Sequence, residues 1–267
     1  MKFSVLMSLY IKENPQYLDE ALQSLAKQSL PATEIVLVFD GPITDELETV
    51  VQKYKDLLPL VEVRLPQNRG LGQALNEGLK HCQYDWVFRM DTDDICLPDR
   101  FAKQVAFIEK QPDTVIFGGQ IAEFGRDIED IVSYRRVPTS APEIVAFTQK
   151  RCPFNHMTVT YKRDKVLEAG GYQDLQEDYY LWINLVARHP QAVANLPDLL
   201  VYARVGNGMV GRRRGLEQAK AEWRLFKLKQ AVKMQGFFAG FATFLLRFIP
   251  RLLPLGLLKW VYGLVRK

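Results

Sequence analysis

Short apolar runs alternate with amphipathic segments along the first hundred residues of the chain. The runs are rich in Val, Leu and Phe, and they cover Ser4–Tyr10, Glu34–Asp40, Val61–Pro66 and Asp85–Met90. Apolar runs of this length are typical of parallel strands that are buried on both faces. Segments with helical spacing lie between them, near residues 15–28, 43–57 and 71–82. The alternation predicts an α/β fold with a mainly parallel central sheet flanked by helices.

The second half of the chain has a less regular pattern. We expect strands at Val115–Phe124, Ile131–Val137 and Met157–Tyr161, and helices at Ala141–Lys150 and Glu177–Arg188. These patterns predict one main domain over residues 1–205, in two halves that meet near residue 97. A basic loop and helix over 206–235 and an amphipathic tail over 236–267 would follow it.

Composition is that of a globular protein. Of 267 residues, 48% are apolar and 25% are charged, which excludes a disordered or fibrous chain. Cys82, Cys96 and Cys152 are too few and too scattered for a disulfide framework or a zinc site, and they favour a reducing compartment. No secretory signal is recognisable, because Lys12 and Glu13 interrupt the first apolar run.

Positive charge is concentrated at the C-terminal end of the chain. The net charge is +4, yet residues 204–267 contain 14 Lys or Arg and only two Asp or Glu. This region also holds two uncharged apolar runs, Phe237–Leu246 and Leu252–Leu258. Both are shorter than the ~18–20 residues that span a bilayer. A basic and apolar tail of this kind predicts contact with an anionic membrane surface, and it is too apolar for nucleic acid.

If the tail is helical, its basic residues gather on one side. At about 100° per residue, five basic side chains fall within an arc of about 120°: Lys233, Arg247, Arg251, Lys259 and Arg266. The remaining surface is mostly Phe, Leu and Ile. We therefore expect helices that lie in the membrane interface. The alternative is a helical pair packed on the body of the protein or on a second subunit.

Polar side chains follow each of the four predicted strands, and the fourth strand runs into Asp91, Asp93 and Asp94. In parallel sheets, ligands bind beyond the carboxyl ends of the strands. Three adjacent carboxylates repel one another unless a cation lies among them. Mg²⁺ typically takes one or two carboxylates together with substrate phosphates. The cluster predicts Mn²⁺ or Mg²⁺ holding a nucleotide diphosphate; the alternative is a solvated acidic turn that caps the helix near Pro98.

These motifs, in this order and spacing, resemble the family 2 glycosyltransferases with the GT-A fold. The resemblance is carried by Ser4–Tyr10, Val38–Gly41, Asn68–Gly70, Ala74, Asn76, Arg89–Asp94, Gly170–Tyr172, Glu177–Tyr179 and Trp182. It covers about residues 3–215 and makes residues 1–97 the nucleotide-binding half and 98–205 the acceptor half. Within the family, the chain is most similar to bacterial exopolysaccharide and O-antigen transferases of the amylovoran type. Gly206 stands where many of these relatives have His.

The resemblance implies roles for individual residues. It assigns the donor nucleotide to Glu13, Asp40, Arg69 and Asp91, the metal ion to Asp93 and Asp94, and the catalytic base to Asp178. Glu13 and Asp40 would contact uracil and ribose. An inverting transfer needs a carboxylate such as Asp178 within hydrogen-bond reach of the acceptor hydroxyl. The alternative for the base is an acidic residue in the first turn of a helix, where the helix dipole favours it.

Further residues are expected near the acceptor or its diphosphate. They are Glu177, Trp182, His156, Arg212 and Arg213. Trp182 lies four residues beyond Asp178 and would form an apolar platform for a sugar ring. His156 would begin a strand and line the acceptor site. The alternatives are a core aromatic residue, a structural histidine and a general basic face.

The implied activity is inverting, metal-dependent transfer of one hexose to a lipid-linked acceptor. Galactose from UDP-galactose is the expected donor sugar, and N-acetylglucosamine on undecaprenyl diphosphate is the expected acceptor. Such an enzyme would lie at the cytoplasmic face of the bacterial inner membrane. The pattern Gln-x-x-Arg-Trp of processive synthases is absent, which favours one sugar per acceptor.

Three alternatives differ from this interpretation. Gly70 and Gly72, with Asp91 beyond them, partly match a dinucleotide fingerprint, but Leu75 occupies the position of its third glycine. A sugar-nucleotide pyrophosphorylase would need a Gly-rich N-terminal loop that this sequence lacks. A non-catalytic membrane scaffold would be expected to show a damaged site, whereas Asp93 and Asp178 are present.

Overall fold

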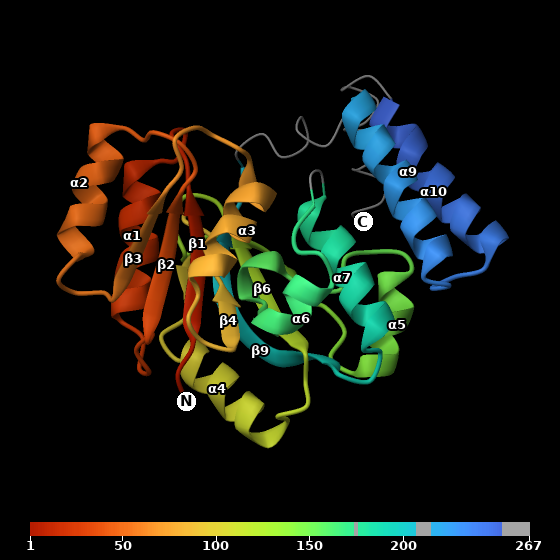
Figure 1. The fold of residues 1–267 in the computed structure, drawn as a ribbon, viewed down its shortest axis with the longest axis horizontal. Helices are drawn as coiled ribbons and strands as arrows, with labels where there is room; N and C mark the ends of the chain where they lie inside the picture. The colour runs from red at the N-terminus through yellow and green to blue at the C-terminus, as the bar shows by residue number, and fades with distance from the viewer. Residues whose placement is uncertain (174–175, 207–214, 253–267) are drawn as a thin grey trace.

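The computed structural model describes residues 1–173, 176–206 and 215–252 (Figure 1). The strands are β1 (Ser4–Leu9), β2 (Glu34–Phe39), β3 (Leu60–Arg64), β4 (Trp86–Arg89), β5 (Ile95–Cys96), β6 (Ile116–Phe124), β7 (Ile131–Arg135), β8 (Thr160–Lys162) and β9 (Val193–Arg204). The helices are α1 (Pro15–Ala26), α2 (Asp45–Tyr54), α3 (Leu71–His81), α4 (Arg100–Lys110), α5 (Ala141–Thr148), α6 (Arg163–Glu168), α7 (Glu177–Arg188), α9 (Leu216–Ala231) and α10 (Phe237–Leu252).

The strands form one mixed sheet in the order β3-β2-β1-β4-β8-β6-β9-β5, with β7 paired to β6. The first four strands are parallel, and the predicted alternation of strands and helices over the first hundred residues is confirmed. After β3 the chain returns past β1 and adds β4 on its other side. The strand order thus reverses between β1 and β4, and at such a switch point a crevice opens beyond the carboxyl ends of the strands.

Two hydrophobic cores cover the two faces of the sheet. Successive side chains of β1 alternate between them: Val5 and Met7 join the core under α1, α2 and α4, whereas Leu6 joins the core under α3, α5, α6 and α7. Every residue of β1 and β2 is buried, as expected for strands covered by helices on both sides. This packing holds the carboxyl ends of β1 and β4 in fixed positions.

The second half of the sheet differs in part from the expectation. The predicted strand over Met157–Tyr161 is replaced by a 3₁₀ turn at His156–Thr158, and β8 begins at Thr160. Side-chain hydrogen bonds hold this turn: Thr158 Oγ1 donates to the carbonyl of Asn155 at 2.8 Å, and Asn155 Nδ2 donates to the carbonyl of Gly119 at 2.8 Å. The bond from Thr158 is a local one of the kind that competes with the sheet ladder, and the bond from Asn155 ties the turn to β6.

Helices α9 and α10 pack as an antiparallel pair, called here the C-terminal hairpin, beside α7 (Figure 1). A buried ion cluster ties the pair together. The side chain of Glu222, only 2% exposed, lies 2.7 Å from Arg247 Nε and 2.9 Å from Arg251 Nη2. The expected arc of basic residues facing a membrane is therefore wrong for these two arginines, because a buried carboxylate requires paired charge. Lys259 and Arg266 lie outside the described residues.

The hairpin is also joined to the beginning of α7. Gln176 Nε2 donates to Glu222 Oε1 at 3.1 Å. Lys229, which is buried, donates to the hydroxyl of Tyr179 at 2.8 Å and to the carbonyl of Gln149 at 2.9 Å. Burial, reinforced by the nearby Arg247, lowers the pKa of Lys229 to about 7. The C-terminal hairpin is thus bonded to the helix that carries Asp178.

Replacing Glu222 by Gln should lower the free energy of unfolding by about 3 kcal/mol, because it removes the negative charge that Arg247 and Arg251 share in a buried site. Chemical denaturation measures the change. The matched control is Glu217→Gln on the same helix, where an exposed pair with Lys220 should contribute less than about 1 kcal/mol. Equal losses in the two variants would contradict the structural role of the buried cluster.

Candidate active site

The acidic segment after β4 lies at the switch point, next to the loop that follows β1. Thr92 Oγ1 donates a hydrogen bond to Glu13 Oε2 at 2.9 Å, and this bond brings Glu13 to the acidic segment. Glu13 precedes α1, whose first turn is capped by Asn14 and begins with Pro15. Two predicted donor-site residues, Glu13 and Asp91, therefore come from neighbouring strand ends, as the sequence analysis expects.

Asp91 is held by a buried guanidinium group. Arg89 Nη2 donates to Asp91 Oδ1 at 2.5 Å, and the side chain of Arg89 is 1% exposed. Arg89 Nη1 also donates to the carbonyl of Leu6 on β1, at 3.2 Å. Burial alone would raise the pKa of Asp91, but the charge of Arg89 overcomes it and lowers the pKa below its ordinary value. Asp91 is thus a fixed, ionised carboxylate in the crevice.

Asp93 and Asp94 have the opposite electrostatic environment. Burial and the charges of Asp91 and Glu13 raise the pKa of Asp93 to about 7. Burial and the charge of Asp93 raise the pKa of Asp94 as well. Asp94 Oδ1 accepts a hydrogen bond from the backbone N–H of Arg204 at 2.8 Å, which fastens the segment to the end of β9. The carboxylates repel one another, and this is the condition that a cation relieves.

The donor set fits a hard divalent cation shared with a ligand. Carboxylate oxygens are the ligands that Mg²⁺ and Mn²⁺ prefer. Within residues 1–173, 176–206 and 215–252, no three His, Cys, Asp or Glu side chains converge on a single metal position. The residues of the acidic segment would therefore supply one or two carboxylates, Asp93 being the more exposed of the pair, and the phosphates of a substrate would complete the coordination.

Asp40 fastens the loop in front of α3. Its Oδ1 accepts from the backbone N–H of Arg69 at 2.6 Å, and its Oδ2 accepts from the N–H of Gly70 at 3.0 Å and from Asn68 Nδ2 at 2.9 Å. Gly41, at φ +88°, completes this turn, because a Cβ atom there would lie 2.6 Å from the backbone nitrogen of Asn68. The sequence analysis did not anticipate this anchoring role. Arg69 itself is exposed at the rim.

His156 lies between the carboxylates of Asp91, a predicted donor-site residue, and Asp178, the predicted base. Its Nε2 is 3.8 Å from Asp91 Oδ1, and its Nδ1 is 4.0 Å from Asp178 Oδ2. The side chain is 14% exposed, and neither ring nitrogen has a hydrogen-bond partner within the described residues. Burial and the charge of Arg89 lower its pKa. A neutral imidazole ring therefore separates Asp91 from the predicted catalytic base.

Asp178 is the second residue of α7, and its side chain is 30% exposed. Its Oδ1 accepts from the backbone N–H of Tyr179 at 2.6 Å, and the thiol of Cys152 lies 3.9 Å from its Oδ2. Burial, followed by the charge of Asp178, raises the pKa of Cys152 to about 12, so this thiol stays protonated. Cys152 is a neighbour that sequence reasoning missed, and no motif identifies it.

A side-chain clamp joins two motifs that are 96 residues apart. Asn76 Nδ2 donates to the carbonyl of Tyr172 at 2.7 Å, and Asn76 Oδ1 accepts from the N–H of Tyr172 at 2.8 Å. Gly171 permits this approach, because a Cβ atom there would lie 2.5 Å from Asn76 Oδ1. The clamp sets the segment before α7 against α3, on the nucleotide-binding half.

The expected platform role of Trp182 is wrong. Its side chain is 0% exposed and packs against the rings of Phe154, Tyr161 and Tyr172. One helical turn beyond Asp178, this side of α7 is buried in the core. The indole ring therefore has no exposed face on which a sugar ring could stack. Glu177 is the first residue of α7. Arg212 and Arg213 lie outside the described residues.

A sheet covered on both faces, with an acidic segment at its switch point, is the arrangement of nucleotide-sugar transferases with the GT-A fold. A sequence profile of glycosyl transferase family 2 matches residues 4–170. The chain belongs to this family and is therefore a transferase. The oxidoreductase and pyrophosphorylase alternatives lose their support with this assignment.

Relatives match the chain over almost its whole length. It is 69% identical to an uncharacterized glycosyltransferase of Haemophilus influenzae, and each chain is covered to 98%. It is 46% identical to the amylovoran biosynthesis glycosyltransferase AmsE of Erwinia amylovora, with 99% of both chains covered. It is 34% identical to the UDP-Gal:alpha-D-GlcNAc-diphosphoundecaprenol beta-1,3-galactosyltransferase of Escherichia coli, with 98% of this chain and 95% of the relative covered.

Solved structures agree on the fold. S. aureus TarS 1-349 in complex with UDP-GlcNAc superposes with a TM-score of 0.69 at 22% identity, covering 94% of this chain and 72% of that one. The mannosyltransferase PcManGT of Pyrobaculum calidifontis, in complex with GDP-Man and Mn²⁺, gives a TM-score of 0.62 at 16% identity and covers 99% of this chain and 81% of that one.

Replacing His156 by Ala should lower turnover by about 100-fold, because the ring fixes the separation of Asp91 and Asp178, and small misplacements of reacting groups cost about this much. Steady-state sugar transfer measures the loss, and thermal melting confirms the fold. His81→Ala is the control, since His81 is exposed and lies on α3 away from Asp178. Turnover equal to that of the control would show that His156 has no part in positioning.

Proposed function

We propose that this protein transfers one hexose, galactose from UDP-galactose, with inversion to N-acetylglucosamine carried on a polyprenyl diphosphate. The observation that supports a transfer between two bound substrates is the placement of Asp91 and Asp178 on opposite sides of the His156 ring. This arrangement leaves one carboxylate for the donor and one for the acceptor. The choice of donor and acceptor rests on the similarity to the galactosyltransferase of Escherichia coli. The reaction would serve the biosynthesis of a bacterial surface polysaccharide, since the names of two similar proteins give amylovoran biosynthesis and O-antigen biosynthesis.

On the donor side, the residues after β1, β2 and β4 would hold the nucleotide. Glu13 and Asp40 would accept hydrogen bonds from uracil and ribose, Arg69 would approach the diphosphate, and Asp91 would face the ribose or the sugar. Asp93, with Asp94, would hold Mn²⁺ or Mg²⁺. When bound, such a cation neutralises charge that develops on the departing diphosphate.

On the acceptor side, Asp178 would accept the proton of the attacking hydroxyl. The acceptor oxygen forms a bond to the anomeric carbon while the bond from that carbon to the diphosphate breaks. Attack from the side opposite the leaving group inverts the configuration, and no covalent intermediate with the protein is needed. The position of Asp178 at the start of α7 supports this role, because its side chain is 30% exposed and an acceptor hydroxyl can reach it.

The C-terminal hairpin would lie on the membrane surface where a lipid-linked acceptor resides. α10 exposes a row of large apolar side chains: Phe238 at 88%, Leu246 at 77%, Phe237 at 58% and Ile249 at 53%. In the part of the chain that the structure describes, no helix has both the length and the apolar character that crossing a membrane requires. Apolar residues exposed in this manner support insertion into the interface, on the cytoplasmic face of the bacterial inner membrane.

Replacing Asp178 by Asn should lower kcat by at least about 100-fold and leave the affinity for the donor within twofold, because a general base acts in the transition state. Steady-state kinetics and equilibrium binding of UDP separate the two effects. Asp164→Asn, a change at an exposed position on α6, serves as the control. An equal loss of donor binding would refute the base assignment.

Replacing Asp93 by Ala should weaken UDP binding in the presence of Mn²⁺ by at least about tenfold, since charge stabilisation by a bound metal is worth several kcal/mol. Without Mn²⁺, the variant and the wild type should bind UDP alike. Calorimetric titrations with and without the metal provide the comparison. Unchanged Mn²⁺-dependent binding would exclude Asp93 as a metal ligand.

Replacing Phe238 and Leu246 together by Ser should lower partitioning onto anionic vesicles by about 100-fold, because each exposed side chain is worth about 1.5–3 kcal/mol when buried. Leu57→Ser with Val132→Ser removes comparable apolar surface at exposed sites outside the hairpin and is the matched control. Vesicle cosedimentation gives the readout. A hairpin variant that stays on vesicles as well as the control would disprove the membrane role of α10.

A further inference from the structure

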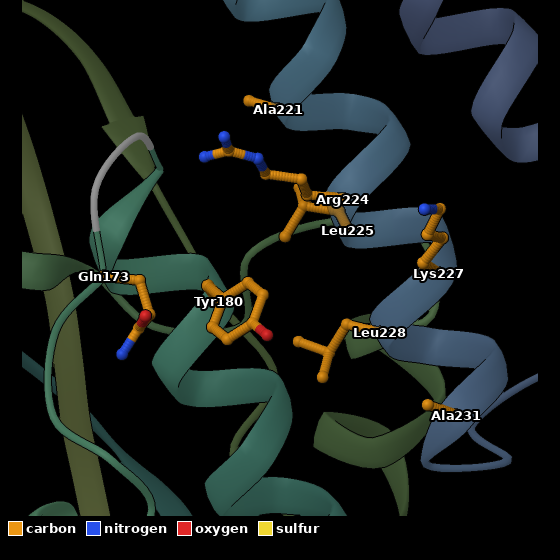
Figure 2. Close-up of a pocket in the computed structure, with 8 residues that line it drawn as sticks. All are labelled: Gln173, Tyr180, Ala221, Arg224, Leu225, Lys227, Leu228 and Ala231. Carbon is orange, nitrogen blue, oxygen red and sulfur yellow. The ribbon is translucent and has the colours of Figure 1, made fainter.

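A pocket of about 460 Å³ lies between α7 and α9, next to the helix that carries Asp178 (Figure 2). Tyr180 from α7 and Leu225, Leu228 and Ala231 from α9 form apolar walls. In Figure 2, the ring of Tyr180 and the side chain of Leu228 approach each other from the two helices. The volume falls in the range of pockets that bind small molecules, about 300–1,000 Å³.

Two cationic side chains, Arg224 and Lys227, also line the pocket from α9. In Figure 2, Arg224 extends from α9 to the side of the pocket nearer α7, whereas Lys227 extends to the opposite side of α9, and its Nζ lies 5.6 Å from the centroid of the Trp223 ring. Both residues are exposed, and within the described residues neither forms an ion pair with a carboxylate. Their positive charges are therefore available to an anion that approaches from outside.

The other charged residues of α9 are already paired. Lys220 lies 2.7 Å from Glu217, and Glu222 pairs with Arg247 and Arg251 of α10. Glu217 and Glu222 are the only two acidic residues of the chain beyond Arg204. The pocket thus combines an apolar wall with cations that have no carboxylate partner, which is the complement of an anionic amphiphile. Guanidinium and ammonium groups bind phosphate oxygens well.

The location of the pocket indicates which anionic amphiphile would bind there. Tyr180 follows Asp178 by two residues on α7, so an occupant lies about one helix diameter, some 10 Å, from the predicted base. The opposite wall, α9, packs on α10, whose apolar side chains face outward. A molecule bound here would have its polar end near the site of transfer and its chain next to the exposed surface of the hairpin.

We propose that this pocket binds the lipid-diphosphate portion of the acceptor. The diphosphate lies against Arg224, the charge of Lys227 adds to the positive potential at the rim, and the first isoprenoid units lie against Tyr180, Leu225 and Leu228. This assignment rests on the lipid-linked acceptor of the proposed function, and it adds where that acceptor is held and which residues recognise it.

A binding experiment on the full-length protein tests the pocket without requiring turnover. Farnesyl diphosphate is titrated into protein saturated with UDP, so that the donor site is occupied. Arg224→Ala should raise the Kd about tenfold, because it removes a charge-assisted hydrogen bond to the diphosphate, and Lys227→Ala should raise it several-fold, because it removes a nearby positive charge. Lys220→Ala, which removes the same charge from the same helix outside the pocket, should change the Kd less than twofold. Equal weakening in all three variants would indicate general electrostatic attraction and overturn the proposal.

The apolar wall has its own test. Leu228→Ser should weaken farnesyl diphosphate several-fold and leave the binding of inorganic diphosphate unchanged, because only the former carries an apolar chain. If both probes are weakened equally, or neither is, the isoprenoid part of the proposal fails. Thermal melting of each variant confirms that the fold persists.

A turnover experiment separates this proposal from the proposed function. With N-acetylglucosamine on a polyprenyl diphosphate as acceptor, the Arg224→Ala/Lys227→Ala double variant should raise the acceptor KM at least tenfold and leave the donor KM unchanged. Normal kinetics in the double variant would overturn the pocket assignment while the activity stands. Absence of turnover in the wild type, together with the expected pattern of probe binding, would overturn the acceptor while the pocket stands as a prenyl-diphosphate site.

Discussion

The contact between Arg89 and Asp91 is the interaction on which the rest of the site depends. A buried guanidinium donates to Asp91 and to the carbonyl of Leu6, so one side chain joins the middle of β1 to the end of β4 and keeps the carboxylate after β4 ionised. The charge of Asp91 in turn raises the pKa of Asp93. His156 lies against Asp91 and extends the arrangement to Asp178. The imidazole ring thus lies between a carboxylate of the first half of the chain and one of the second half.

The C-terminal hairpin is part of the catalytic body and not a detached anchor. Glu222 and Lys229 connect it to Gln176, two residues before Asp178, and to Tyr179, directly after it. Because Arg247 and Arg251 both pair with the buried Glu222, membrane attraction in the described part of the hairpin has to come mainly from apolar side chains and from the remaining basic residues. A hairpin of this kind couples the position of the predicted base to the surface that would carry the acceptor.

Much of this arrangement could be predicted from the sequence, for physical reasons. Strands that are buried on both faces have an uninterrupted apolar pattern, so β1 and β2 were recognisable. The acidic segment was recognisable because it directly follows β4, which has the same pattern. Long-range side-chain pairings leave no such pattern: the Asn76–Tyr172 clamp, the thiol of Cys152 beside Asp178, and the anchoring bonds of Asp40 depend on folding. Helical spacing predicts correctly that Trp182 lies one turn beyond Asp178 on α7. It does not predict whether that position is exposed, and in the structure it is buried. Helical spacing also places Arg247 in an arc of basic residues, but it does not predict the partner of that charge, which in the structure is the buried Glu222.

The central claim is that the acidic segment at the β1/β4 switch point binds the diphosphate of a sugar nucleotide through a cation. A crystal structure of the protein with UDP and Mn²⁺ tests it most directly. The account predicts the uracil near Glu13 and Asp40 and the metal between Asp93 and the diphosphate oxygens. A nucleotide bound elsewhere, or a diphosphate without a metal beside Asp93, would contradict it.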